Sequence, residues 1–519
     1  MTTSAANHGG SHTRPSMVLF VLATIVGAGA VVPFVLLITQ AAGSGWQRFT
    51  TFLLRPRTIE LLLNSLALMV AVSLLCLVIG VLLAWVLVSF QLPAKRALIV
   101  LSCLPLAVPS YIATLAVLSA FPHATGFVPL VLAMTLTCLP LVTIPVLGAL
   151  ALASRDGMDV ARTLGENTFM AFVRTTVPQI LPAAMSGVLL VALYVLSDFG
   201  APAMMRFETL TTGVYMVFSS SFNRANAAVM SLPLAALAIA VVLVERRVRA
   251  TSKYHQAGTS AAAPSRRSPM VTTRGRTWAL TAFVIVVSGT AVAFPVGSLL
   301  WRMRQGTRYL SDLSRLFDAT VTTLWIAVIA ATIATVAALP ISYLAARYRH
   351  RSIAVVEGAH FLGNALPSVV VALALVSTML TLFKGSYQSM SILMAAYVVL
   401  YISKTIGASR SGIALVPLAA EDAARTLGRN RFSTAIEVTL RGALPGITAG
   451  WLLVVIAVMK ELPVTLMLRP IGVNTLATEL WAKSTLGAYA AAAPIGVLLV
   501  LVGVLPAWWM SRNVMKDVS

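Results

Sequence analysis

Charged residues are scarce in this chain: Asp, Glu, Lys and Arg make up 10% of the 519 residues, whereas hydrophobic residues make up 58%. Cysteine is scarcer still. The three cysteines, Cys76, Cys103 and Cys138, lie inside apolar runs and form no Cys-x-x-Cys pair. This argues against a disulfide framework and against a zinc site. We expect the three side chains to be small buried hydrophobes.

Sequence motifs of catalytic sites are missing as well. No Gly-Lys-Ser or Gly-Lys-Thr occurs, so the chain has no loop of the kind that cradles nucleotide phosphates. Gly-x-Ser-x-Gly, His-Glu-x-x-His and clusters of Cys and His are also absent. The sequence therefore predicts a protein that is not an enzyme and that binds no cofactor.

Apolar runs of about twenty residues recur along the chain, and each could cross a hydrocarbon core of about 30 Å as a helix. The runs lack the two-residue alternation of a membrane β-barrel. We therefore predict an all-α polytopic membrane protein with about twelve transmembrane helices, embedded in a lipid bilayer. The spans are expected at about 17–39, 60–90, 97–120, 127–150, 180–203 and 228–245, and then at 278–300, 319–347, 353–382, 388–406, 443–466 and 489–509.

The basic residues indicate the orientation of the chain. A net charge of +22 would suggest a nucleic-acid partner in a soluble protein, but here Lys and Arg lie mainly in the loops between spans. A cytosolic N-terminus puts most of them in cytosolic loops, where Lys and Arg are normally retained. The basic residues at 48–57 and 302–315 argue locally for the opposite orientation. We predict a multi-pass membrane protein with a cytosolic N-terminus and no nucleic-acid partner.

One polar stretch occurs twice. The pentapeptide at 161–165 recurs letter for letter at 424–428, and with this offset of 263 the residues 161–187 match 424–450 at 11 of 27 positions. Earlier segments pair at an offset of 258, as Pro109-Ser110 does with Pro367-Ser368. The chain is therefore a tandem duplication, and an even number of spans in each copy inserts both halves in the same orientation. We expect a disordered tail at 1–16, a first half at 17–245 with its core at 60–245, a cytosolic linker at 246–277, a second half at 278–512 with its core at 319–510, and a C-terminal tail at 513–519.

The repeated stretch has the pattern of a docking helix. On a helix, one side of each copy would carry small residues and a single Leu, a surface that can enter a groove closely. The alternative is an interfacial helix resting on lipid headgroups, but such helices normally carry large apolar residues and many Lys. We therefore interpret the stretch as a docking surface for a partner outside the membrane. The residues on this side are Val160, Ala161, Leu164 and Gly165 in the first copy and Ala423, Ala424, Leu427 and Gly428 in the second.

These stretches resemble the cytoplasmic loop motif of binding-protein-dependent ABC importer permeases, Glu-Ala-Ala-x-x-x-Gly followed by a hydrophobic run that ends in Pro. Asp replaces the Glu in both copies; Pro178 stands at the expected place in the first, whereas Arg441 stands there in the second. In that family the motif forms a coupling helix that docks into a cytosolic ATPase subunit. The resemblance implies this role for Asp159, Ala161, Arg162 and Gly165, and for Asp422, Ala424, Arg425 and Gly428.

The resemblance also implies a location in the bacterial inner (plasma) membrane, the remaining architecture and the partners. We expect the type I ABC importer permease fold, with two parallel six-helix repeats around a central path. Two copies of a cytosolic ABC ATPase subunit would drive transport, and an extracytoplasmic substrate-binding protein would deliver the substrate. ATP hydrolysis is expected on the separate ATPase subunits.

The segments that follow each motif indicate the substrate. Residues 197–202 and 210–215 in the first half and 460–470 in the second are similar to ferric-iron permeases with two fused halves. We therefore expect ferric iron, with thiamine, phosphonate and polyamine permeases of the same family as alternatives. The alternative from another class is a twelve-helix secondary transporter with two parallel halves, in which the duplicated motif has no purpose. A membrane enzyme is the weakest alternative.

Two acidic residues occupy equivalent positions near the outer ends of equivalent helices: Asp198 and, 263 residues later, Glu461. Carboxylates at membrane depth are costly and generally face a cavity or a partner charge. In one interpretation they line the translocation path as transient oxygen ligands of a trivalent cation, without a tight site, since conduction needs weak ones. In the other, Glu461 pairs with Lys460, and each carboxylate caps a helix break introduced by Pro202 or Pro463.

Overall fold

The computed structural model describes residues 16–43, 45–153, 156–221, 224–259, 273–304, 313–348, 350–382 and 387–518. Helices make up most of these ranges. The first half contains α1 (Met17–Gly43), α2 (Trp46–Leu53), α3 (Pro56–Ser89), α4 (Lys95–Cys103), η1 (Leu104–Ala107), α5 (Ser110–Ala120), α6 (Phe127–Leu152), α7 (Asp156–Thr163), α8 (Thr168–Ala171), η2 (Phe172–Thr176), α9 (Val177–Ser197), α10 (Gly200–Met204), α11 (Leu210–Ser221) and α12 (Arg224–Thr259).

The second half repeats this order. It contains α13 (Arg274–Arg304), α14 (Leu313–Arg347), α15 (Arg351–Ala365), α16 (Ser368–Leu382), α17 (Met390–Leu415), α18 (Leu418–Thr426), α19 (Arg431–Thr434), η5 (Ala435–Leu440), α20 (Leu444–Met459), α21 (Pro463–Leu468), α22 (Leu476–Thr485) and α23 (Tyr489–Val518). The short π-helical turns η2 and η5 lie at equivalent positions of the two copies. The structure thus repeats local detail as well as helix order.

The candidate membrane spans agree with an all-α polytopic protein. In the ranges given above, eight helices are long and apolar enough to cross a bilayer, and three bent helix pairs bring the number to 11. A shorter apolar helix, Tyr489–Val504, lies where the last span was predicted. The prediction of an all-helical fold is therefore confirmed.

Two of the predicted spans, 97–120 and 353–382, are broken in the middle. The helix axis turns by 90° between Ala107 and Ser110, and by 100° between Gly363 and Ser368. A proline lies in each break, at Pro109 and Pro367. Proline has no N–H to continue a helix, and it forces the preceding residue into an extended conformation. Both breaks follow from the Pro-Ser pairs that the repeat has kept.

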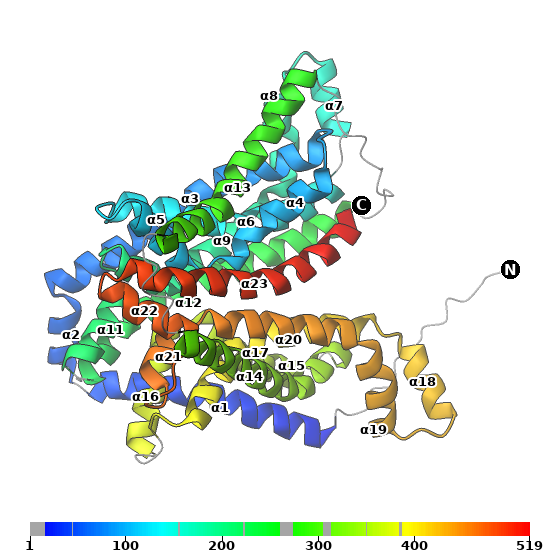
Figure 1. Cartoon of the computed structure of the whole chain (residues 1–519). Helices are drawn as coiled ribbons and strands as arrows, with labels where there is room; N and C mark the ends of the chain where they lie inside the picture. Colours follow the sequence, from blue (N-terminus) through cyan, green and yellow to red (C-terminus); the bar gives the residue numbers. More distant parts are fainter. Residues whose placement is uncertain are drawn as a thin grey trace.

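The first helix of each half packs against the other half. α1 contacts α14, α15 and α16 of the second half, and α13 contacts α4, α5 and α6 of the first. In Figure 1, α1 runs along the lower part of the molecule with α14 to α17, whereas α13 lies in the upper part with α3 to α6. Gly27 of α1 lies so close to α15 that an added Cβ would be 3.1 Å from the His360 ring. One buried apolar cluster contains residues of both halves.

Helices extend into two segments that we expected to be a linker and a tail. The linker predicted at 246–277 is helical at both ends, because α12 continues to Thr259 and α13 begins at Arg274; residues 260–272 lie outside the described residues. The C-terminal tail predicted from residue 513 is helical as far as Val518. Hydropathy marks where a span leaves the bilayer, whereas a helix can continue into water for as long as its residues are helix formers. Most of the predicted N-terminal tail, 1–15, lies outside the described residues.

Candidate functional site

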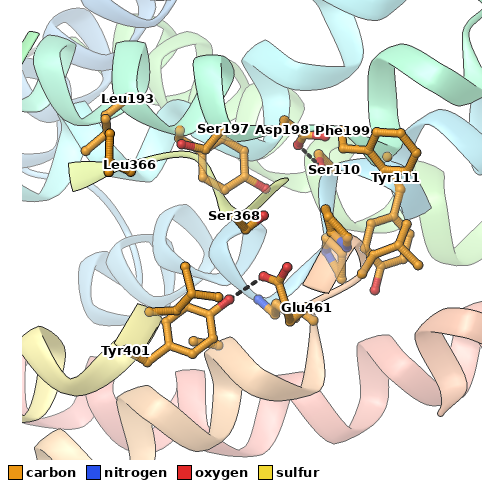
Figure 2. A pocket seen from close by; sticks show the side chains of 18 of the residues that line it. Ser110, Tyr111, Leu193, Ser197, Asp198, Phe199, Leu366, Ser368, Tyr401 and Glu461 are labelled. Carbon is orange, nitrogen blue, oxygen red and sulfur yellow. Dashed lines mark hydrogen bonds between the residues drawn. The ribbon is translucent and has the colours of Figure 1, made fainter. Parts of the chain in front are cut away.

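A cavity of about 350 Å³ lies between the two halves. Its walls are the two broken spans together with α6, α9, α10, α17, α20 and α21. Figure 2 shows Ser110 and Asp198 on one side, Tyr401 and Glu461 on the other, and Ser368 between them. The polar residues on the wall are Ser110, Tyr111, Tyr194, Ser197 and Asp198 from the first half, and Ser368, Tyr401, Lys404, Lys460 and Glu461 from the second.

Asp198 is the first residue beyond α9. Its backbone is extended, with ψ at 129°, so the side chain folds back over the start of α10. Oδ1 accepts a hydrogen bond of 3.0 Å from the backbone N–H of Ala201, and Oδ2 accepts one from the hydroxyl of Ser110. The carboxylate therefore caps α10 and ties it to the first residue after the break at Pro109.

Glu461 repeats this arrangement in the second half. Its Oε1 accepts a hydrogen bond of 3.2 Å from the backbone N–H of Val464, the equivalent of Ala201. Its Oε2 accepts one from the hydroxyl of Tyr401, and Ser368, the equivalent of Ser110, lies on the same cavity wall. Asp198 and Glu461, which the sequence paired, are thus brought to one cavity as matched caps.

Two lysines complete the ring of polar groups, and both come from the second half. Lys460 donates from Nζ to the carbonyl oxygen of Leu106 at 2.6 Å, which links the two halves. In the described part of the chain it forms no ion pair with Glu461, so the expected pairing is wrong, whereas the expected capping is present. Lys404 lies beside Tyr401, with Nζ 5.8 Å from the ring centroid. Neither Lys404 nor Tyr401 was identified from the sequence, although a lysine inside a predicted span is itself a signal.

The repeated motif forms α7 in the first half and α18 in the second. Figure 1 shows α7 and α8 at the upper right of the molecule and α18 and α19 at the lower right, so both pairs project at the same end. Leu164 and Leu427, which follow these helices, are 79% and 84% exposed. Asp159, Arg162, Asp422 and Arg425 are exposed as well. The two motifs thus present exposed tips away from the apolar body.

Each motif ends in a left-handed glycine. Gly165 has φ at 93° and Gly428 has φ at 85°. The next residue in each copy donates its N–H five residues back, Glu166 to Ala161 and Arg429 to Ala424, both at 3.1 Å. This is the Schellman closure, which favours glycine because a side chain strains the left-handed conformation.

The expected docking face of the motif is only partly correct. Ala161 and Ala424 are each 9% exposed, and Ala161 packs with Met158 and Ala171 under the helix. The alanines therefore face the protein, whereas Val160 is 57% exposed with Leu164. A helical wheel groups residues by angle, but it cannot say which side the rest of the chain covers.

Comparison with known proteins agrees with this architecture. Residues 76–251 and 338–516 match the family described as binding-protein-dependent transport system inner membrane component. An Fe(3+)-transport system permease protein from Haemophilus influenzae is 29% identical over 97% of this chain and 99% of its own length. A molybdenum transport system permease protein from Mycobacterium tuberculosis is 32% identical over 34% of this chain and 72% of its own length. A sulfate transport system permease protein from Escherichia coli is 26% identical over 33% of this chain and 66% of its own length.

Both halves of the chain match the family separately, as the duplication predicts. The resemblance inferred from the repeated motif is therefore confirmed, and the alternative of a secondary transporter falls away. The chain belongs to the binding-protein-dependent transport system inner membrane components, as the multi-pass, non-catalytic permease subunit of an ABC importer.

Proposed function

We propose that this permease subunit carries ferric iron across the inner membrane. The observation that supports iron is the length of the match: the Fe(3+)-transport permease aligns with 97% of this chain. The molybdenum and sulfate permeases align with only 34% and 33% of it. A relative that shares both halves and the segment between them is the better guide to the substrate.

The cavity between the halves is the part of the path that we assign to the cargo. Asp198 and Glu461 lie on its opposite sides, and both carboxylates already accept hydrogen bonds from hydroxyl and backbone groups. Oxygen atoms engaged in this way bind a passing cation weakly. Weak binding is what conduction requires, since a tight site would hold the cargo.

The repeated motifs are the sites that we assign to the ATPase subunits. α7 and α18 project at one end of the molecule, and α1 begins at the same end (Figure 1). Two cytosolic ATPase subunits, one at each motif, would place this end and the N-terminus in the cytosol. An extracytoplasmic binding protein would then deliver iron at the opposite end. ATP hydrolysis can move a half of the permease only if the ATPase contacts it differently in the two states of the transport cycle. Each half therefore needs its own docking motif.

Uptake by a deletion strain tests the substrate. The strain complemented with the complete system should accumulate radiolabelled iron(III) and should lose this activity when the permease gene alone is removed. Thiamine, a phosphonate, a polyamine, molybdate and sulfate serve as competing labels in the same cells. Uptake of one of these without iron would refute the iron assignment and leave the permease assignment intact.

A further inference from the structure

The two carboxylates of the cavity already accept hydrogen bonds from the protein. Asp198 accepts from Ser110 and from the N–H of Ala201, and Glu461 accepts from Tyr401 and from the N–H of Val464. These bonds shape the two helix breaks, so a carboxylate that left them to bind iron would leave a buried N–H unpaired. An unpaired buried donor is costly. The carboxylates are therefore structural caps first and weak cation ligands at most.

Lys404 is the charged group of the cavity whose hydrogen-bond donors are not used within the described residues. It lies in the middle of α17, and its ammonium is near the face of Tyr401. Within the described residues it forms no salt bridge, and no hydrogen bond from Nζ is found there. Lys460, by contrast, uses Nζ to bind the Leu106 carbonyl oxygen at 2.6 Å. An ammonium has three donors and no acceptor, so it binds oxygen acceptors, and it binds an oxygen anion most strongly.

The two lysines belong to the second half only. At the equivalent positions, 263 residues earlier, the first half has Leu141 and Ser197, which line the same cavity. The repeat therefore does not require positive charge at these places for folding. A lysine at membrane depth is costly and generally serves a path or a ligand.

The size of the cavity agrees with a ligand larger than a bare ion. About 350 Å³ falls within the range of about 300–1,000 Å³ typical of small-molecule sites. Several hydroxyl groups line the same wall, including those of Tyr194 and Ser197. A metal ion that still carries an oxygen-rich ligand would fill this space and meet donors on several sides.

We propose that the cargo passes through this cavity with an oxyanion bound to it, as an iron(III) complex of carboxylate, phosphate or carbonate, and that Lys404 contacts the oxyanion. This inference rests on the proposed function, because it specifies the form in which iron crosses. A free oxyanion offers Lys404 the same chemistry, so the experiment has to separate the two sources.

Transport measured with two labels distinguishes an oxyanion bound to iron from a free oxyanion. The complete transporter, with its ATPase and binding protein, is placed in proteoliposomes and given radioactive iron(III) with labelled citrate, phosphate or bicarbonate in turn. Entry of iron together with one of these labels in a fixed ratio is the expected result. Entry of iron with none of the three would overturn this inference and leave the iron assignment standing. Entry of molybdate or sulfate without iron would support the anion contact but refute iron as the cargo.

Variants of Lys404 test the residue itself. Lys404→Gln should lower co-uptake about tenfold, the effect of one lost charge-assisted hydrogen bond. Lys404→Arg, which keeps the charge and the donors, should restore most of it. Lys483→Gln, on α22 outside the cavity, is the matched control. ATP hydrolysis stimulated by the binding protein should persist in all three variants, which shows that the complex is assembled. Unchanged uptake by Lys404→Gln, or equal losses in the Gln and Arg variants, would contradict the assigned contact.

Discussion

Arg347 and Glu421 form a buried ion pair, with Nη2 2.6 Å from Oε1 and side chains that are 8% and 3% exposed. Arg347 also donates to the Val416 carbonyl oxygen at 3.0 Å, and Thr439 donates to the same Oε1 at 2.8 Å. The pair therefore fastens α18 to the end of α14 and to η5. At the equivalent positions the first half has Ser89 and Met158, and Met158 fastens α7 through apolar contacts. The two motifs are held by different chemistry.

Glu421→Gln should destabilise the protein, because it leaves the Arg347 guanidinium buried without a counter-charge. Loss of one partner of a buried pair costs about 3–5 kcal/mol, which should lower the thermal unfolding midpoint of the purified protein. Arg410→Gln, which breaks the more exposed pair with Glu357 (Arg410 is 48% exposed), should cost less than about 1 kcal/mol. Equal midpoints for the two variants would contradict this account.

The double variant Arg347→Met/Glu421→Met addresses the same pair without leaving a buried charge. Apolar residues of similar volume often replace a buried pair at little cost, and the first half already uses a methionine here. The double variant should therefore be more stable than Glu421→Gln alone. A double variant as unstable as the single one would show that the ion pair itself is required.

The glycines that end the motifs should tolerate asparagine far better than valine. At Gly428, where φ is 85°, a side chain costs about 1–2 kcal/mol and a β-branched one more, whereas Asn visits this conformation readily. Gly428→Val should unwind the end of α18 and reduce co-purification of the ATPase subunit. Gly428→Asn should retain it. Loss of the ATPase subunit from both variants would mean that the partner needs the bare glycine surface, not the turn.

The repeat made much of this fold predictable, and the remainder depended on contacts that hydropathy does not register. The offset between copies paired Asp198 with Glu461 before any helix was placed, and the structure brings both to one cavity. The breaks at Pro109 and Pro367 were missed because an apolar run has the same hydropathy whether its helix is straight or bent. Lys404 was not identified as a site residue, since a single lysine inside an apolar run gives no sign of which neighbours it faces.

A second pair of matched glycines should be intolerant of any side chain. An added Cβ on Gly187 of α9 would lie 2.7 Å from the Val142 Cα and 2.8 Å from the Leu141 carbonyl oxygen. An added Cβ on Gly450, its equivalent, would lie 2.9 Å from the Thr405 Cα. Gly187→Ala should push α9 away from α6, at a cost of about 1–3 kcal/mol, and should distort the cavity wall at Leu141. Gly148→Ala, with nothing within 4 Å, is the control on α6. Thermal stability and uptake that match this control would contradict the tight packing.

The rims of the two motifs carry ion pairs of opposite order. Glu166 pairs with Arg174 in the first half, and at the equivalent positions Arg429 pairs with Glu437 in the second. The two ATPase subunits would thus dock at motifs in which the positions of the acidic and the basic residue are exchanged. If the pair serves only to brace the turn, the order of its charges is immaterial.

Reversing the first pair separates bracing from recognition by the partner. Glu166→Arg alone sets two arginines side by side, and it should lower ATP-driven uptake by an amount that shrinks at high salt, because exposed charges are screened. Glu166→Arg/Arg174→Glu gives the first half the order of the second and should restore uptake to within about twofold, as expected when two mutations act through one contact. Uptake is measured at low and high ionic strength beside that of Arg174→Glu. Uptake that stays low in the double variant despite normal membrane levels would show that the ATPase subunit recognises the position of each charge. The two docking sites would then not be interchangeable.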